Sequence, residues 1–391
     1  MRFLRDLSVS AVTAGVVAVL VGFTSSAAIV FQAARALGGD DAAVSSWIGA
    51  IGIGVGLCSL VPSLWLRKPV MVAWSTPGAA VIATGAAGHS MAQGVGAFLV
   101  CAALILLVGV TGWFEKLMDR IPRGIAAALL AGVLARFGMQ AFSAAEAAPL
   151  LVCCMVGSYL LARRFVPRYA VLASLSAGVL CAAAQGGLAS ASVPLMLTHP
   201  VFVAPEFTWS ATIGLALPLF IVTMASQNLP GVAAMRAAGY EMPVSRLVSL
   251  TGVATLLLAP FGAYALNLSA ITAAICMGAE AHPDPARRYT AAVTSGALYC
   301  VLGLMGATVV ALLTAFPPAL VACIAGLALL GTIGAGLTTL IEDSAHREAA
   351  VIAFLVTMSG VVVAGVGSAF WGVVAGTIAL FVQKYRLRSP A

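Results

Sequence analysis

The chain has 391 residues, of which 62% are hydrophobic and 8% charged, and its formal net charge is +7. A soluble globular protein is about 45–50% apolar and about 25% charged, so a soluble enzyme, a nucleic-acid-binding protein and a disordered scaffold are excluded. Apolar stretches of about 20 residues, typical of membrane-spanning helices, recur along the chain. The sequence therefore predicts an all-α polytopic membrane protein.

Polar and Gly/Pro-rich breaks divide the chain into fourteen predicted spans. Their approximate limits are 9–35, 43–65, 76–88, 93–113, 123–142, 147–163, 168–186, 212–229, 244–263, 269–279, 290–314, 318–341, 348–364 and 367–383. The third and the tenth are too short to cross a hydrocarbon core of about 30 Å alone. The first is expected to be a span and not a cleaved signal peptide, because its apolar run is long.

The basic residues test this span count independently of hydropathy, because cytoplasmic loops are enriched in Lys and Arg. With the N-terminus inside, all but two of the 20 Lys and Arg residues fall in cytoplasmic segments; the exceptions are Arg35 and Arg136. The long outer segment 187–209 contains neither residue type. The pattern predicts fourteen crossings with both termini in the cytoplasm.

Seven predicted spans precede the long outer segment and seven follow it, so the two halves are expected to insert in opposite orientations. The predicted organisation is a first repeat over 1–186, a connector over 187–211 and a second repeat over 212–391. Short, Gly/Pro-interrupted segments at corresponding positions of two halves indicate a transporter binding site. Spans 3 and 10 are such a pair.

Each of these two short spans predicts an extended stretch followed by a half-helix. In span 3 the extended stretch ends at Trp74, and Pro77 in the first turn is a helix-start signal. In span 10 an extended stretch follows Gly262, and Ser269 is the expected N-cap. Two helices that start inside the membrane direct unpaired N–H groups at one point and so favour an anion. The alternative is that Pro77 and Gly262 are ordinary kinks.

Polar residues interrupt the apolar spans 1 and 8 at mid-depth. Span 1 contains Phe23, Thr24 and Ser25, and span 8 contains Gln227 and Asn228. Amide side chains are costly in hydrocarbon unless they face partners or a cavity. These residues are therefore candidates for the site, with interhelical hydrogen bonding as the alternative.

Several segments of the sequence resemble the BenE-type benzoate/proton symporters of bacterial inner membranes. The resemblance covers essentially the whole chain and is most specific over 69–78, 225–231 and 259–268. The segment 324–342 also looks like the twelfth span of nucleobase/cation symporters.

This resemblance implies a seven-plus-seven inverted repeat with discontinuous segments 3 and 10. Its core domain would contain spans 1–4 and 8–11, its gate domain spans 5–7 and 12–14, and the core would move like an elevator against the gate. The substrate would lie between the half-helices, flanked by spans 1 and 8. The implied substrate-binding residues are Phe23, Thr24, Ser25, Trp74, Ser75, Thr76, Pro77, Gly78, Gln227, Asn228, Tyr264, Asn267, Leu268, Ser269, Ala270 and Thr272.

Within this set, the substrate carboxylate is expected at the backbone N–H groups of the two helix starts. These are the amides of Ser75, Thr76, Gly78, Ser269 and Ala270. The aromatic ring of the substrate is expected against Phe23 and against Trp74 or Tyr264.

One departure from the nucleobase transporters bears on the substrate. Those relatives carry glutamates in spans 8 and 10, where this chain has 226–228 (Ser-Gln-Asn) and 269–272 (Ser-Ala-Ile-Thr). Because a carboxylate side chain would repel a carboxylate substrate, the difference favours a monoanionic aromatic acid. It leaves the proton-carrying residue unassigned.

The sequence thus predicts proton-coupled uptake of benzoate or a similar aromatic carboxylate across the bacterial inner membrane. Expected partners are that acid, protons and the bilayer, with no nucleic acid; relatives often dimerise through the gate, which leaves a homodimer open. The eight cysteines lie in apolar runs, without a CxxC or a nearby histidine pattern, and are expected to pack, so no metal site is predicted. Since the sequence has no HExxH, no GxSxG and no paired intramembrane carboxylates, no catalytic residue is predicted either, and no cofactor is expected. The alternatives are a transporter of the same fold for a nucleobase or an inorganic anion, and a passive anion channel.

Overall fold

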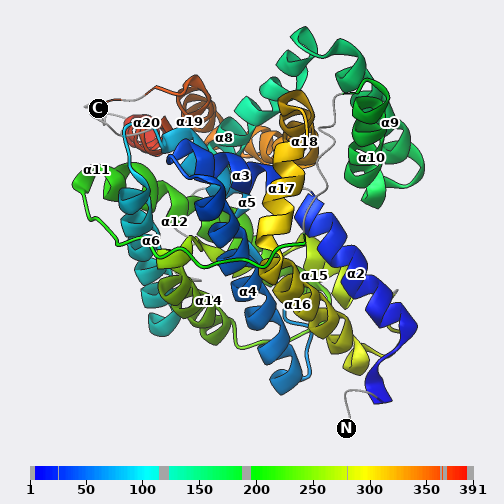
Figure 1. Cartoon of the computed structure of the whole chain (residues 1–391). Helices are drawn as coiled ribbons and strands as arrows, with labels where there is room; N and C mark the ends of the chain where they lie inside the picture. Colours follow the sequence, from blue (N-terminus) through cyan, green and yellow to red (C-terminus); the bar gives the residue numbers. More distant parts are fainter. Residues whose placement is uncertain are drawn as a thin grey trace.

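The computed structural model describes residues 5–24, 26–113, 123–186, 195–279, 281–361, 363 and 368–384. Its elements are mostly helices (Figure 1). In the first half they are α2 (Val9–Thr24), α3 (Ala27–Ala36), α4 (Asp41–Leu66), β1 (Val72–Trp74), α5 (Thr76–Gly85), α6 (Met91–Thr111), α8 (Arg123–Ser143), α9 (Pro149–Phe165) and α10 (Ala170–Ala184).

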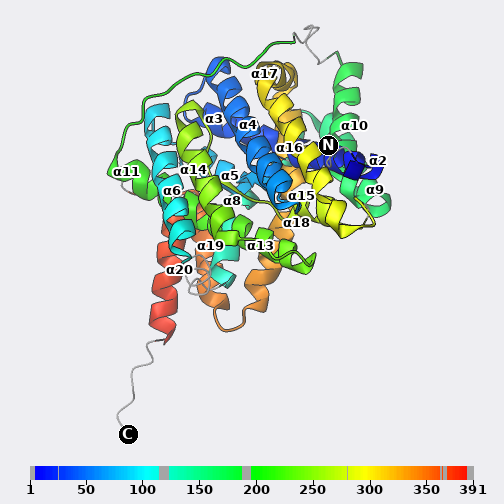
Figure 2. The same cartoon turned by 90° about the horizontal axis from the view of Figure 1, so that it is seen from below.

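In the second half, too, long helices come before a short strand and a short helix, and further helices follow. Its elements are α11 (Trp209–Ala211), the π-helical turns Thr212–Ala216 and Met224–Asn228 on either side of α12 (Leu217–Thr223), α13 (Leu229–Ala237), α14 (Val244–Leu258), β2 (Leu266–Leu268), α15 (Ile271–Met277), α16 (Tyr289–Leu304), α17 (Gly306–Ala315), α18 (Pro318–Glu342), α19 (Arg347–Ser359) and α20 (Ser368–Lys384). The connector 195–208 runs along one end of the molecule without helix or strand (Figure 2).

The long helices pack in pairs drawn from the two halves of the chain. Helix α4 lies along α16, α6 along α14, and α8 along α18. Glycines permit the closest of these approaches: a Cβ on Gly56 would lie 2.6 Å from the carbonyl oxygen of Gly296, and one on Gly296 would lie 2.7 Å from that of Gly56. Such small-residue contacts allow membrane helices to approach closely.

Seven helical segments of the described chain are long and apolar enough to cross a membrane. They are Val9–Ala36, Asp41–Leu66, Met91–Thr111, Ala127–Glu146, Trp209–Val232, Val244–Phe261 and Pro318–Glu342. They match seven of the fourteen predicted spans, and the remaining predicted spans correspond to shorter helices or helix pairs. Predicted span 290–314, for example, is divided at Met305 into α16 and α17.

The short strands β1 and β2 join the two halves near the middle of the molecule. They pair antiparallel, with Val72 opposite Leu268 and Trp74 opposite Leu266. Serine hydroxyls of α4 hold the first segment: Ser63 Oγ accepts from the Val70 N–H (2.9 Å), and Ser59 Oγ accepts from the Val72 N–H (3.0 Å). A two-stranded ribbon is marginal in water, but here buried side-chain acceptors satisfy backbone groups that the ladder leaves free.

Candidate functional site

A cavity of about 810 Å³ lies at the ends of the two strands. One wall comes from β1, α5, α15, α2 and the turn before α13, and the other wall comes from α8, α9, α10 and α18. Seven of the sequence-predicted site residues line it, namely Trp74, Thr76, Pro77, Gln227, Ser269, Ala270 and Thr272. The two half-helix starts therefore face the same space.

The start of α5 is fixed by the hydroxyl of Ser75, which is fully buried. Ser75 Oγ accepts from the Gly78 N–H at 3.0 Å, which makes Ser75 the N-cap of α5, and it also accepts from Thr223 Oγ1 at 2.9 Å. Neither Ser75 nor Gly78 lines the cavity, so both hold the helix start in place while Thr76 and Pro77 face the cavity.

The start of α15 differs from the prediction by one residue. The N-cap position is Ala270, and its side chain makes no capping bond. Ser269 lies one residue earlier, where its Oγ accepts from Thr272 Oγ1 at 2.7 Å. The expectation that Ser269 caps this helix is thus wrong, because its hydroxyl bonds a side chain and not a backbone N–H of the first turn.

Three of the backbone donors expected to bind a carboxylate already have protein acceptors. The Gly78 N–H bonds Ser75 Oγ, the Ser75 N–H bonds the Ala265 carbonyl (3.2 Å), and the Ser269 N–H bonds the Met71 carbonyl (2.9 Å). The first-turn N–H groups of a helix have no intrahelical acceptor. Of the five predicted donors, the N–H groups of Thr76 and Ala270 remain at the cavity, and those of the first turn of α15 add to them.

The adjacent amides Gln227 and Asn228 have different environments. Asn228 is fully buried, and its Oδ1 accepts from the Leu268 N–H at 2.9 Å at the end of β2. Gln227 lines the cavity, and its amide makes no hydrogen bond to any residue that the structure describes. Asn228 thus bonds the backbone of β2 and does not line the cavity, whereas Gln227 lines it without a described protein partner.

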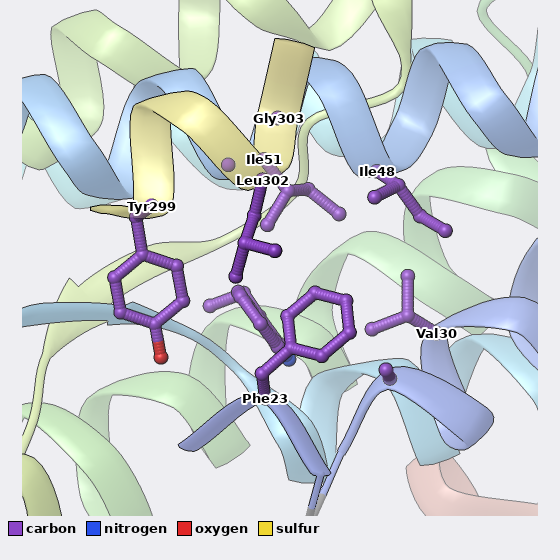
Figure 3. Close-up of a pocket in the computed structure, with 10 residues that line it drawn as sticks. Phe23, Val30, Ile48, Ile51, Tyr299, Leu302 and Gly303 are labelled. Carbon is purple, nitrogen blue, oxygen red and sulfur yellow. The ribbon is translucent and has the colours of Figure 1, made fainter. Parts of the chain in front are cut away.

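Three aromatic rings form a layer beside the strand β1. Trp74 meets Phe23 edge-on, with centroids 6.1 Å apart, and it meets Tyr299 edge-on at 5.7 Å. Phe23 does not line the large cavity; with Tyr299 it bounds an adjacent apolar pocket of about 10 Å³, which Ile51 and Leu302 also line (Figure 3). Trp74 and Tyr299 line both spaces, and the buried Trp74 Nε1 has no hydrogen-bond partner in the described part of the chain.

Tyr299 is a site residue that the sequence prediction missed. It lies in an apolar stretch of α16 without any local signal. What marks Tyr299 is a contact in the fold with Gly22 of α2, which also lines the cavity: a Cβ on Gly22 would lie 2.4 Å from the Tyr299 hydroxyl oxygen. That relation requires the fold and cannot be read from the sequence.

Two other predicted residues point away from the cavity, and the fold explains why. The Tyr264 ring is fully buried in a cluster with Trp47 and Phe98, each with its centroid 5.8 Å away, and it does not line the cavity. Asn267 is buried as well, and its Nδ2 donates to the Ala265 carbonyl at 3.0 Å. Ala265 has a φ of 37°, in the left-handed region that non-glycine residues rarely adopt, and Asn267 helps to fix that bend.

The remaining predicted residues are placed only in part. Leu268 contributes its backbone to β2 and does not line the cavity. Thr24 ends α2, and nothing is described of its side chain; Ser25 lies outside the described residues. The prediction for these last two positions stays a prediction.

The opposite wall of the cavity contains small residues of α18 and one charged side chain. Gly331, Ala335 and Gly336 leave the space open, and Arg163 of α9 is the one charged residue among the described residues that line it. No group of three or more potential metal-ligating side chains occurs in the described ranges. The cavity thus offers neutral hydroxyl, amide and indole groups, aromatic surface and a single guanidinium.

Comparison with known proteins identifies the family. Residues 5–382 match the family model BenE, described as benzoate membrane transport protein. The chain is 46% identical over 369 residues to the inner membrane protein YdcO of Escherichia coli (strain K12), covering 94% of each chain. It is 38% identical over 378 residues to the benzoate membrane transport protein of Acinetobacter baylyi, covering 97% of this chain and 96% of the relative.

Two solved structures share the fold at low sequence identity. One is the transmembrane domain of a cyanobacterial bicarbonate transporter, BicA, with a TM-score of 0.60 and 13% identity over 94% of this chain and 97% of that chain. The other is SLC26A9, with a TM-score of 0.61 and 11% identity over 99% of this chain and 68% of that chain. The resemblance inferred from the sequence segments is confirmed: the chain belongs to the BenE family of benzoate membrane transport proteins.

Proposed function

We propose that this protein is a secondary active transporter that takes up benzoate, or a similar aromatic carboxylate, together with a proton. Membership of the BenE family and the named function of the Acinetobacter relative support the substrate. The single observation that carries the proposal is the cavity, which combines free helix-start N–H groups with the Trp74 and Tyr299 rings. Backbone N–H groups at helix starts suit a carboxylate, and the rings suit an aromatic body.

In this proposal the carboxylate lies between the starts of α5 and α15. The Thr76 N–H and the first-turn N–H groups of α15 donate to it, and Gln227 donates from the flank. Ser269 contributes its hydroxyl hydrogen on the same side, because its Oγ accepts from Thr272 Oγ1 and keeps its own hydrogen for another acceptor. The ring of the substrate lies toward Trp74 and Tyr299. Tyr299 thus has the role that the sequence predicts for Tyr264.

For the whole chain we propose fourteen segments in two inverted repeats, with segments 3 and 10 discontinuous. The core would contain α2–α6 and α11–α17 and the gate α8–α10 and α18–α20. Elevator-like movement of the core against the gate would carry the substrate, since the cavity lies between these two groups. We further place the protein in the bacterial inner membrane with both termini in the cytoplasm, in agreement with the inner-membrane relative and the Lys and Arg distribution.

Uptake of labelled benzoate into proteoliposomes tests the function. With an inward proton gradient, accumulation above a protein-free control is expected, and collapse of the gradient with a protonophore should abolish it. Equal accumulation with and without the gradient would contradict proton coupling. No accumulation in either condition would contradict benzoate transport.

Competition and electrical measurements separate the alternatives. Unlabelled benzoate is expected to compete, whereas uracil, bicarbonate and sulfate at the same concentration are not; the reverse pattern would favour a nucleobase or an inorganic anion. One proton carried with one monoanion moves no net charge. A benzoate-dependent current without concentrative uptake would instead indicate a passive channel.

A further inference from the structure

The wall of the cavity formed by the proposed gate contains an arginine, Arg163, that is not part of the carboxylate site proposed at the helix starts. Arg163 lies in the last turn of α9 and lines the cavity with Tyr159, one helical turn earlier. Its Nη1 donates to Tyr159 Oη at 3.3 Å. No acidic side chain among the described residues pairs with Arg163, so the guanidinium keeps donors free toward the cavity.

The surroundings of Arg163 suit an aromatic acid. A Cβ placed on Gly331 of α18 would lie 3.6 Å from Arg163 Nη1 and 4.0 Å from Nη2, so the guanidinium packs over a glycine and no side chain covers it there. Pro167, Ala170 and Val171, which follow α9 in the chain, line the same cavity. A guanidinium binds carboxylates through two parallel hydrogen bonds, and the apolar neighbours can contact a ring.

Tyr159 supports the same chemistry. Its ring is buried, with 5% of the residue exposed, and its hydroxyl oxygen accepts from Arg163. A tyrosine hydroxyl that accepts from one group retains its own hydrogen for another acceptor. Arg163 and Tyr159 together therefore present donors to one anion, and the Tyr159 contact restrains the long arginine side chain.

We propose that Arg163, oriented by Tyr159, is a second binding position for the substrate carboxylate, on the gate side of the cavity. This proposal rests on the proposed function. This second position lies between the helix starts and the cytoplasmic face. During uptake the aromatic acid binds there after it is released from α5 and α15. Because Arg163 belongs to the gate and the helix starts belong to the core, elevator movement changes their separation, and Arg163 serves only the cytoplasm-facing state.

The neighbouring Arg164 provides a matched control. Its guanidinium lies over the ring of Phe165, with Cζ 5.7 Å from the centroid, and Arg164 does not line the cavity. Arg163→Gln and Arg164→Gln remove the same charge from the same predicted cytoplasmic segment. Any effect of that charge on membrane insertion is therefore equal in the two variants.

The experiment measures benzoate exchange in right-side-out and inverted membrane vesicles preloaded with unlabelled benzoate at equal pH on both sides. Loss of a charged hydrogen bond predicts that Arg163→Gln raises the half-saturating concentration at the cytoplasmic face by about tenfold or more. At the outer face the change should stay within about twofold, as should any effect of Arg164→Gln at either face. Tyr159→Phe should shift the same face in the same direction by a smaller factor, and Arg163→Lys should restore part of the affinity.

Equal effects of the Arg163 and Arg164 variants, or equal effects of Arg163→Gln at both faces, would overturn the proposal. Elution profiles of the purified variants in gel filtration separate a folding defect from a binding defect, and partial recovery in Arg163→Lys makes the same distinction in vesicles. Failure of the wild-type protein to exchange benzoate would instead overturn the proposed function, and with it this position. The two failures are therefore distinguishable.

Discussion

The neighbouring amides Gln227 and Asn228 show how one polar pair of residues serves both the fold and the site. Both residues belong to the π-helical turn Met224–Asn228, and of the two only Gln227 lines the cavity. Asn228 turns to the strand β2, where Gly231 also approaches: a Cβ there would lie 2.8 Å from the Leu268 carbonyl oxygen. Gln227 turns to the cavity without a protein partner.

This division predicts opposite phenotypes for two adjacent substitutions. Asn228→Ala leaves the buried Leu268 N–H without an acceptor, which costs about 1–3 kcal/mol of stability. Gln227→Ala removes no protein hydrogen bond but one proposed donor to the carboxylate, so affinity should fall by about five- to tenfold. Thermal unfolding in detergent and benzoate exchange in vesicles measure the two effects. A destabilised Gln227→Ala variant with unchanged exchange would contradict the assignment of Gln227 to the site.

Not every residue of the cavity can be predicted from its local sequence. The polar interruption of span 8 predicted Gln227 as a site residue, because unpaired polar groups in hydrocarbon require a reason, and Gln227 lines the cavity. Tyr264 and Tyr299 are both tyrosines among apolar neighbours, and only the packed fold distinguishes them: Tyr264 lies between Trp47 and Phe98, and Tyr299 lies on the cavity. Arg163 was counted only as a marker of orientation, since its charge carries that meaning in any loop.

At the scale of elements, the joint between β1, β2 and the two half-helices depends on a small set of buried hydroxyl groups. Ser59 and Ser63 hold the first strand segment, Thr255 Oγ1 accepts from the Leu266 N–H (3.2 Å), and Ser75 caps α5. Each satisfies a backbone donor where the chain is neither helix nor a full sheet. A buried donor without a partner is costly, so these hydroxyls determine the position of the half-helices.

Ser75 is the residue of this set whose loss should be most damaging. Ser75→Ala removes the acceptor for both the Gly78 N–H and the Thr223 hydroxyl, whereas Thr223→Val removes one hydrogen bond and leaves the cap intact. Loss of an N-cap costs about 1 kcal/mol, and the orphaned hydroxyl adds about 1 kcal/mol or more. The unfolding temperature should therefore decrease in the order wild type, Thr223→Val, Ser75→Ala. A Thr223→Val variant less stable than Ser75→Ala would show that the cap is not the principal interaction.

Elements whose position depends on local sequence signals can be predicted from the sequence, and elements whose position depends on tertiary contacts cannot. The extended stretches and the helix start before Pro77 follow from local signals, and β1 and α5 occupy those positions. The start of α15 was misplaced because Ser269 is a favourable N-cap residue by type, yet its hydroxyl bonds Thr272 in the fold. The pairing of β1 with β2 joins segments almost 200 residues apart, as the register Val72 opposite Leu268 shows, and no local pattern encodes it.

At the scale of the whole molecule, the cavity and the basic residues together indicate a direction of opening. Arg163 and Thr339, which line the cavity, lie near the ends of α9 and α18 that the Lys and Arg pattern places in the cytoplasm. The cavity should therefore be reached from the cytoplasm in this conformation. Helix length and hydropathy identify seven candidate spans among the described residues. Neither quantity tells which end of a span faces the cytoplasm, so the predicted orientation depends on the charges.

Two adjacent threonines of α18 test that direction. Thr339 lines the cavity and Thr338 does not, although both are exposed and each hydroxyl donates 3.0 Å to the carbonyl four residues earlier. In a Cys153→Ser background, which removes an exposed native thiol, a membrane-impermeant maleimide should modify Thr339→Cys in inverted vesicles and not in right-side-out vesicles. Saturating benzoate should slow that modification several-fold, because substrate in the cavity blocks access to the thiol. Modification of Thr338→Cys should not respond to benzoate, since its side chain lies outside the cavity. Reaction of Thr339→Cys with the maleimide in right-side-out vesicles would contradict the predicted orientation. Equal protection of both cysteines by benzoate would contradict binding in this cavity.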